Sequence, residues 1–172
     1  MMKIGCDFDG TLTDYGFQAG SPVKVNTPLL ETLRGSEITI ITNQGGLAFG
    51  IMQSNRVDGR KYPLPIYFFN RYRDFVAIAK NFDVKVIQLQ IALFHPKAQQ
   101  HYVDLVKDEL FDLLVTHNSR FDFRIYLTEH YRKPHSNMLE LAEIEIYYGD
   151  SDEDQAAALE AGIEFMKVER YI

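Results

Sequence analysis

The sequence has little cysteine and no long hydrophobic run, and each shortage excludes a class of protein. Its 172 residues include a single cysteine, Cys6, which has no partner for an internal disulfide. The apolar stretches are only as long as a strand, and the N-terminus lacks the basic-then-apolar pattern of a signal peptide. We therefore expect a reduced, cytoplasmic protein that does not associate with membranes, and the sequence indicates no protein partner.

Cysteine and histidine are also too dispersed for a structural zinc site, because the five histidines never stand at zinc-ligand spacing with cysteine.

With 46% hydrophobic and 24% charged residues, the composition is that of an ordinary globular domain. A chain of this length buries about 70% of its unfolded surface. No repeat, low-complexity tract or Pro/Gly/Ser-rich linker divides the sequence, so we expect one domain over residues 1–172.

Negative charge is concentrated near the C-terminus. Residues 140–169 contain ten acidic residues against Lys167 alone, whereas residues 1–139 contain 14 acidic and 16 basic residues. Such an acidic region is either a solvated helix face or a site partly neutralised by a bound cation.

Apolar runs of strand length alternate with helix-like segments, a pattern typical of a doubly wound α/β fold with a parallel sheet. The strands are expected near residues 3–7, 38–42, 84–91, 122–127, 145–148 and 163–168. The helices are expected over residues 27–33, 66–81, 98–115 and 151–161. Parallel sheets bind ligands at the carboxyl ends of their strands, so the loops that follow strands are where we expect chemistry.

Two carboxylates follow the first expected strand, in the stretch "DFDGTLTD". Asp7 and Asp9 are two residues apart, so in an extended chain they point to the same side. Carboxylates beside a Gly-Thr turn often cap the turn. The alternative is a catalytic pair, in which one carboxylate is a nucleophile and the other an acid and base.

Three further loops carry polar groups. The stretch "TNQGG", residues 42–46, offers a hydroxyl, an amide and backbone N–H groups to a phosphate oxygen, although the same residue types also make ordinary turns. The stretch "RKPHSNM", residues 132–138, places a cation just before a helix. The stretch "GDSDED", residues 149–154, either caps the next helix or holds a hard cation through oxygen ligands.

Taken in order, "DFDGTLTD", "TNQGG", "RKPHSNM" and "GDSDEDQAAALEAG" resemble the four motifs of the haloacid dehalogenase superfamily of aspartate-nucleophile phosphatases. They extend from Asp7 to Gly162 and therefore cover nearly the whole chain. The second and third motifs are similar to those of the branch that contains polynucleotide 3′-phosphatases, histidinol-phosphate phosphatases and heptose bisphosphate phosphatases. The resemblance implies a Rossmann-like fold with a small or absent cap.

Two features differ from that branch. Its histidinol and heptose members commonly carry a cysteine- and histidine-rich zinc loop before the third motif, and this sequence has no cysteine there. The stretch between the second and third motifs is long, and we interpret residues around 95–120 as a small insertion. This insertion is either a cap over the site or added scaffold.

The resemblance implies a phosphomonoester hydrolase that forms an aspartyl-phosphate on Asp7. An ordinary carboxylate is ionised at neutral pH, so Asp7 needs positioning more than deprotonation. By the same resemblance, Asp9 protonates the leaving group and then activates water. Thr42 and the backbone N–H of Asn43 bind phosphoryl oxygens, and Lys133 offsets the charge of the phosphate and of Asp7.

A magnesium ion is also implied by the resemblance. Its ligands would be Asp7, the backbone carbonyl of Asp9, and Asp150. Asp154 would orient the metal-bound waters or Lys133. Such an ion makes a cluster of carboxylates tolerable beside an anionic substrate.

The segment after the second motif carries the only hint about the substrate. Residues 53–80 contain six basic residues against two acidic ones, and Arg56, Arg60 and Lys61 are candidates for substrate contact. Neighbouring aromatic residues offer faces for stacking on nucleic-acid bases. The alternative is a helix with an apolar face toward the core, made by Phe68, Tyr72, Phe75 and Ala79.

The sequence therefore predicts a magnesium-dependent phosphatase for a nucleic-acid or nucleotide 3′-phosphate. The alternative substrate is a small metabolite, such as a sugar phosphate or a nucleotide. A phosphotransferase that uses the same aspartyl-phosphate, and a non-catalytic binding protein on the same fold, are further alternatives.

Overall fold

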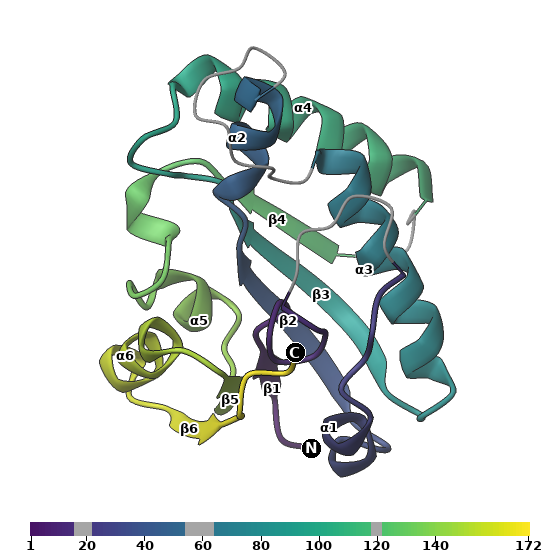
Figure 1. The fold of residues 1–172 in the computed structure, drawn as a ribbon. Coiled ribbons are helices and arrows are strands. Elements are labelled where there is room, and N and C mark those ends of the chain that lie inside the picture. The colour runs from purple at the N-terminus through teal and green to yellow at the C-terminus, as the bar shows by residue number, and fades with distance from the viewer. Residues whose placement is uncertain (16–21, 54–63, 118–121) are drawn as a thin grey trace.

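The computed structural model describes residues 1–15, 22–53, 64–117 and 122–172. A six-stranded parallel sheet has the order β4-β3-β2-β1-β5-β6, so the chain winds outward in both directions from β1 (Figure 1). The predicted doubly wound parallel sheet is thus confirmed. The strands are β1 (Ile4–Cys6), β2 (Glu37–Asn43), β3 (Lys85–Ala92), β4 (Asp122–Tyr126), β5 (Ile146–Gly149) and β6 (Glu164–Lys167).

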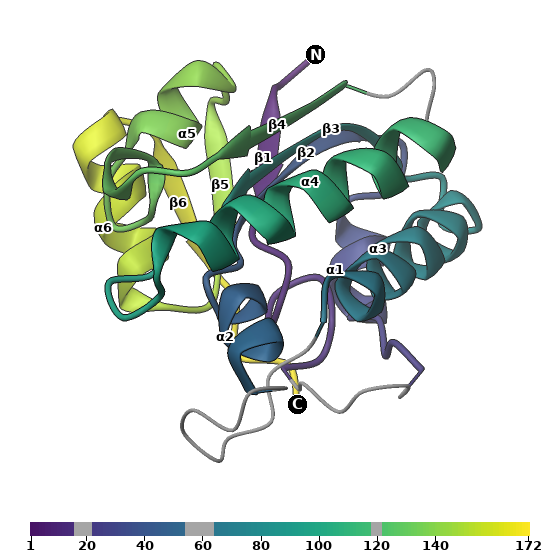
Figure 2. The same ribbon diagram turned by 90° about the horizontal axis from the view of Figure 1, so that it is seen from above.

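Helices cover both faces of the sheet. Helices α2, α3 and α4 lie on one face, and α5 and α6 lie on the other (Figure 2). Within the described residues, no helix has the length and apolar character needed to cross a membrane. The helices are α1 (Thr27–Thr32), α2 (Gly46–Gln53), α3 (Pro65–Lys80), α4 (Gln100–His117), α5 (Asn137–Leu141) and α6 (Asp152–Ala161), with a short 3₁₀ helix η1 (Glu129–Tyr131).

Buried apolar side chains form two clusters, one on each face of the sheet. Along β2, Ile38 and Ile40 belong to the cluster shared with α1, α3 and α4, whereas Ile41 belongs to the cluster shared with α5 and α6. This is the alternation expected of successive residues in a strand. Because the central strands are buried on both faces, their sequences are nearly continuous apolar runs, which made them easy to predict.

Helix α3 buries the aromatic face that its spacing predicts. The side chains of Phe68, Tyr72, Phe75 and Ala79 are all buried. The ring of Phe8, in the loop after β1, packs edge-on against Phe68 and Phe75, with ring centroids 5.7 Å apart in both pairs. The structural interpretation of these aromatic residues is therefore confirmed, and their faces are not open for stacking on bases.

Helix α2 is absent from the elements that the sequence predicts, which place residues 42–46 in a loop and assign no element to residues 47–53. It follows "TNQGG" directly and contains glycine at positions 46 and 50, which weakens intrinsic helix propensity. Its side chains Leu47, Ala48 and Met52 are nevertheless buried. Packing of these apolar side chains in the core stabilises a helix that local propensity does not favour.

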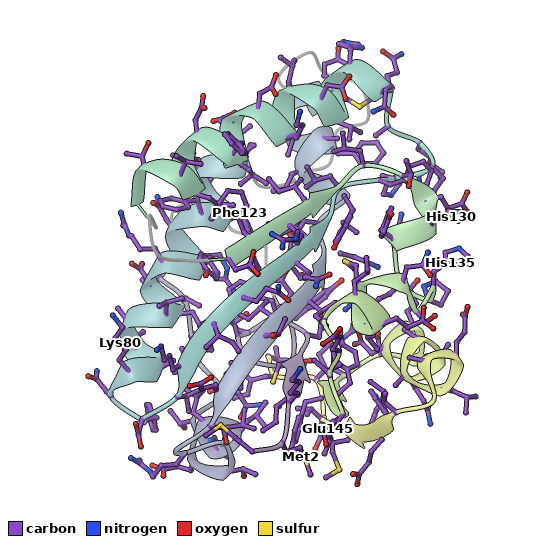
Figure 3. The ribbon with its side chains drawn as sticks, turned by 180° about the vertical axis from the view of Figure 1, so that it is seen from behind. Met2, Lys80, Phe123, His130, His135 and Glu145 are labelled. Atoms are coloured by element: carbon purple, nitrogen blue, oxygen red, sulfur yellow. The ribbon has the colours of Figure 1, made fainter. Side chains whose placement is uncertain are left out.

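Helix α4 occupies most of the segment that we interpreted as a small insertion. It is the crossover between β3 and β4, and the buried side chains of Val103, Val106, Leu110 and Leu114 join the same core cluster as α3. Seen from the opposite side of the molecule (Figure 3), Phe123 of β4 lies beneath this helix. Its ring centroid is 5.8 Å from that of Phe111 in α4. Helix α4 therefore belongs to the layer of helices on the sheet.

Candidate active site

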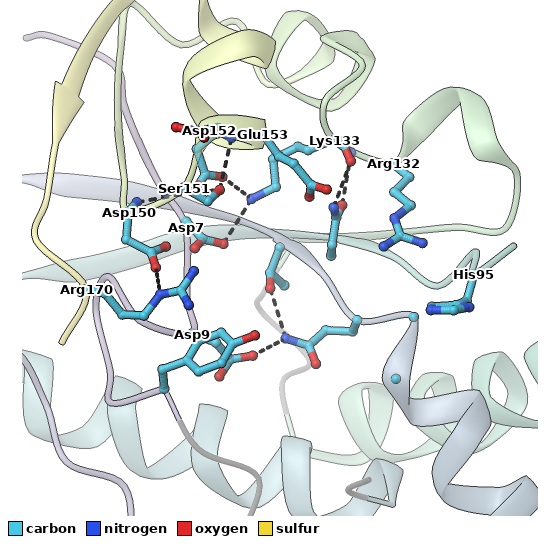
Figure 4. Close-up of a pocket in the computed structure, with 17 residues that line it drawn as sticks. Asp7, Asp9, His95, Arg132, Lys133, Asp150, Ser151, Asp152, Glu153 and Arg170 are labelled. Carbon is cyan, nitrogen blue, oxygen red and sulfur yellow. Dashed lines mark hydrogen bonds and ion pairs between the residues drawn. The ribbon is translucent and has the colours of Figure 1, made fainter. Parts of the chain in front are cut away.

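The four sequence motifs meet at the carboxyl ends of the central strands. They surround a cavity of about 490 Å³ (Figure 4). Of the predicted site residues, Arg56, Arg60 and Lys61 lie outside the described part of the chain. The others all line the cavity: Asp7, Asp9, Thr42, Asn43, Lys133, Asp150 and Asp154.

Phe8 anchors the loop after β1. Its side chain is fully buried against α3, so Asp7 and Asp9, on either side of it, face the cavity instead. The turn that follows has Gly10 at φ 82°, a conformation that favours glycine. A Cβ atom at this position would stand 2.6 Å from Oδ2 of Asp150, so the glycine also lets the loops after β1 and β5 approach each other.

Lys133 is a buried cation at the centre of the site. Its Nζ donates to Oδ1 of Asp7 at 2.9 Å and to Oδ1 of Asp154 at 2.6 Å. Two further oxygens, the Tyr147 hydroxyl and the Ile41 carbonyl, lie 2.7 and 3.1 Å from the same nitrogen. Burial by itself lowers the pKa of the ammonium, but attraction to Asp154 and Asp7 outweighs burial and raises the pKa above its usual value. Lys133 is therefore charged at neutral pH.

Three carboxylates lie close together beside this lysine. Each of Asp7, Asp150 and Asp154 places one oxygen within 4.8 Å of the others, and all three are buried. The Thr11 hydroxyl lies 3.3 Å from Oδ2 of Asp7 and 3.1 Å from Oδ1 of Asp150, so its single proton can be donated to either carboxylate. Burial raises the pKa of Asp7 well above its usual value; Lys133 opposes this shift and Asp154 adds to it. A buried set of hard oxygen donors with excess negative charge fits a cation such as Mg²⁺.

Asp154 both caps α6 and positions Lys133. Its backbone N–H donates to the Ser151 hydroxyl, and its Oδ2 accepts from the Ser151 backbone and hydroxyl, which is a capping box. Its Oδ1 accepts from Lys133 and from the Tyr147 hydroxyl. Although burial raises the pKa of Asp154, the contact with Lys133 outweighs burial and lowers it. Asp154 therefore caps α6, as one interpretation of this acidic stretch predicts, and the cation site stays a prediction.

The second motif holds Asp9 in place through Gln44, a residue that we did not single out in the sequence. The Nε2 atom of Gln44 donates to Oδ2 of Asp9 at 2.7 Å and to the Thr42 hydroxyl at 2.9 Å. Burial raises the pKa of Asp9, and the hydrogen bond from Gln44 and the charge of Arg71 oppose the shift. The only signal for Gln44 was its position inside "TNQGG", because glutamine is otherwise common in loops.

The side chain of Asn43 joins the second motif to the third. Its Nδ2 donates to the backbone carbonyl of Lys133 and its Oδ1 accepts from the Lys133 backbone N–H, both at 3.0 Å. This pair of bonds fixes the backbone from which the Lys133 side chain enters the core. The side chain of Asn43 is therefore occupied, and its backbone N–H is the group predicted to bind a phosphoryl oxygen.

Three other residues of the site carried no usable signal in the sequence. Tyr147 belongs to an apolar strand run, and Thr11 stands in a turn, where threonine is common. Arg170 follows the last strand, yet its Nε donates to Oδ2 of Asp150 at 2.8 Å. Each was missed because its function depends on a partner that is distant in the sequence.

We expect Gln44→Ala to reduce turnover more than it weakens substrate binding. The substitution removes the hydrogen bond that orients Asp9 and the one to the Thr42 hydroxyl, but it leaves the contact between Asp7 and Lys133 in place. A lost hydrogen bond to a charged or titrating group is worth about 1.5–3 kcal/mol, so kcat should fall by about ten- to a hundredfold. Steady-state kinetics with an aryl phosphate measures this, and an unchanged kcat with a raised KM would contradict it.

Comparison with known proteins gives a relationship of fold. No family model matches the sequence, and no curated protein matches it. The structure is similar to the crystal structure of a D,D-heptose 1.7-bisphosphate phosphatase from B. bronchiseptica complexed with magnesium and phosphate. The TM-score is 0.63 at 16% sequence identity, and the match covers 99% of this chain and 82% of that chain. The whole described chain therefore has the α/β architecture of that solved structure.

Proposed function

We propose that this chain is a magnesium-dependent phosphomonoester hydrolase of the haloacid dehalogenase type. The observation that carries the proposal is the buried Lys133 between Asp7 and Asp154, with Asp9 held by Gln44 in the lining of the same cavity. Buried ionisable groups with shifted pKa values that gather in a cavity are typical of catalytic sites. The similar solved structure is that of a phosphatase and contains magnesium and phosphate, which supports the same activity here.

Asp7 is the nucleophile in this proposal. Lys133 holds one of its oxygens and Thr11 the other, so the carboxylate is fixed in position. An oxygen of Asp7 attacks phosphorus, and the bond between phosphorus and the leaving oxygen breaks. Burial favours the protonated form of Asp9, which gives its proton to the leaving oxygen. The products of this half-reaction are an alcohol and an aspartyl-phosphate.

The second half-reaction regenerates the site. Asp9, now ionised, takes a proton from a water molecule as the water oxygen attacks phosphorus. The bond between phosphorus and Asp7 breaks, and its electron pair returns to the carboxylate. Overall, a phosphomonoester and water give an alcohol and phosphate, and both aspartates end in their starting protonation states.

Asp7 and Asp150 are the side chains that would hold magnesium, together with the backbone carbonyl of Asp9. Asp154 already accepts hydrogen bonds on both of its oxygens, so it positions Lys133 and the loop around the ion. When bound, the ion supplies positive charge to the phosphoryl oxygens and to these carboxylates. Thr42 and the backbone N–H of Asn43 bind other phosphoryl oxygens.

A small phosphorylated molecule is the substrate that we favour. A cavity of about 490 Å³ is of the size that holds a metabolite. Of the aromatic residues of α3 that offered stacking faces for bases, Phe68 and Tyr72 are buried in the core and Tyr67 is half-buried. The similar solved structure is named for a sugar bisphosphate. A nucleic-acid 3′ end stays a prediction that rests on Arg56, Arg60 and Lys61.

A substrate screen tests both the proposed phosphatase activity and the proposed class of substrate. With Mg²⁺ present, we expect phosphate release from an aryl phosphate and from at least one sugar phosphate or nucleotide, and no release in excess EDTA. A 3′-phosphorylated oligonucleotide should be hydrolysed more slowly than the best small molecule. Preference for the oligonucleotide, reduced by alanine at positions 56, 60 and 61, would reverse the choice of substrate, and no release from any ester would overturn the proposed activity.

A further inference from the structure

Lys133 has no hydrogen-bond donor left for a substrate. An ammonium group carries three protons, and four protein oxygens already lie within 3.1 Å of this nitrogen. The side chain is only 3% exposed, so a phosphoryl oxygen cannot approach without displacing one of those partners. Lys133 therefore contributes charge to the site, and the hydrogen bonds to an incoming phosphate must come from other groups.

The C-terminal tail brings a second cation to the same cavity. After β6 the chain crosses the loops that follow β1 and β5 and is fixed there by backbone hydrogen bonds. The N–H of Val168 donates to the carbonyl of Gly149 at 2.8 Å, and that of Tyr171 donates to the carbonyl of Gly10 at 2.9 Å. Arg170 lies between these two anchors, and its side chain lines the cavity (Figure 4).

Arg170 is held in one orientation and still has donors available. Its Nε bonds to Asp150, and its guanidinium carbon lies 4.3 Å from the centre of the Tyr15 ring. Within the described residues, no hydrogen bond is formed by its two terminal nitrogens. The side chain is 47% exposed, so these nitrogens are open to a ligand. Two parallel N–H groups on a planar guanidinium match the geometry of a phosphate.

We propose that Arg170 binds the phosphoryl group of the substrate, donating from its terminal nitrogens to oxygens that Lys133 cannot reach. This inference rests on the proposed function. Its support is the combination of three contacts: Asp150 on Nε, the Tyr15 ring on the guanidinium face, and the backbone anchors on either side. A residue that only neutralised Asp150 would use one nitrogen and would need neither the ring nor the exposed fork.

Binding of inorganic phosphate to the magnesium-saturated protein tests the inference directly. Calorimetric titration should show phosphate affinity about 10- to 100-fold weaker in Arg170→Gln, because a charge-assisted interaction is lost. Arg170→Lys keeps the charge without the planar fork, so its affinity should fall between those of Arg170→Gln and the wild type. Arg34→Gln is the matched control, since Arg34 forms an exposed ion pair with Glu31, away from the cavity, and phosphate affinity should not change.

Titration with Mg²⁺ alone separates substrate binding from a role in holding Asp150. If the only role of Arg170 were to hold the Asp150 carboxylate, Arg170→Gln would alter the affinity for Mg²⁺ but not the affinity for phosphate at saturating Mg²⁺. That result would overturn the inference. If Arg170→Gln does not fold, the phosphate affinity of Arg170→Lys tests the inference instead. An affinity equal to that of the wild type in Arg170→Lys would also overturn the inference. Because phosphate binding needs no turnover, the result for Arg170 is independent of whether any ester is hydrolysed.

Discussion

Asp7→Asn should abolish phosphate release from an aryl phosphate, leaving a rate about 10⁴-fold or more below that of the wild type. The amide that replaces the carboxylate is a poor nucleophile and cannot form the aspartyl-phosphate. It also cannot form an ion pair with Lys133, so one negative charge is removed from the group that would hold magnesium. The measurement is phosphate release at saturating Mg²⁺ and substrate.

The Asp7→Asn variant is expected to stay folded, which separates lost chemistry from lost structure. Asparagine has nearly the same shape as aspartate, its amide oxygen can still accept from Lys133, and Lys133 keeps Asp154 as its counter-charge. Circular dichroism checks the fold. Asp74→Asn is a matched control, because Asp74 is exposed and lies outside the cavity, and its turnover should equal that of the wild type. Turnover by Asp7→Asn within tenfold of the wild type would refute the assignment of the nucleophile.

Lys133→Met should reduce the free energy of unfolding by about 3–5 kcal/mol, as expected when one partner of a buried ion-pair network is removed. The methionine has a similar length but leaves Asp7 and Asp154 buried without their shared cation. Phosphatase activity should be lost as well, because the nucleophile is no longer held. Urea denaturation in EDTA, followed by circular dichroism, measures the change in stability.

Two comparisons test whether the loss of stability in Lys133→Met comes from its buried ion pairs. Arg34→Met removes an exposed ion pair with Glu31 and should change stability by less than about 1 kcal/mol. Added Mg²⁺ should recover part of the stability that Lys133→Met loses, because a bound cation replaces some of the missing positive charge. A Lys133→Met protein as stable as the wild type in EDTA would show that Lys133 does not balance the buried carboxylates.

Local patterns in the sequence were sufficient to predict most of the fold. All six strands were predicted to within one or two residues, because each contains an apolar stretch of strand length, and β1, β2 and β5 at the centre of the sheet are largely buried. The spacing of Phe68, Tyr72, Phe75 and Ala79 predicted a helix that buries one face, and they are buried in α3. Helix α2 was missed because its glycines oppose helix formation, and burial against the rest of the core decides its structure.

The order of the motifs, read from the sequence alone, indicated which residues would gather at the ends of the strands. Asp7, Asp9, Thr42, Lys133 and Asp150 do line one cavity. The choice of these residues rested on the resemblance of the four motifs to a known superfamily, and each motif directly follows or precedes an element whose type the local pattern indicates. A parallel sheet then brings those positions to a single edge.

Only the tertiary structure decided how the side chains of the site are connected. Asp7 and Lys133 are 126 residues apart, and nothing near either residue in the sequence specifies a 2.9 Å contact. The folded chain decides how many oxygens surround the side-chain nitrogens of Lys133 and Arg170. The number of oxygens in turn decides whether either side chain has an N–H group left for a ligand. Periodicity and motif spacing describe neighbours along the chain, whereas hydrogen-bond partners are set by packing between elements, so this part of the site became visible only in the folded protein.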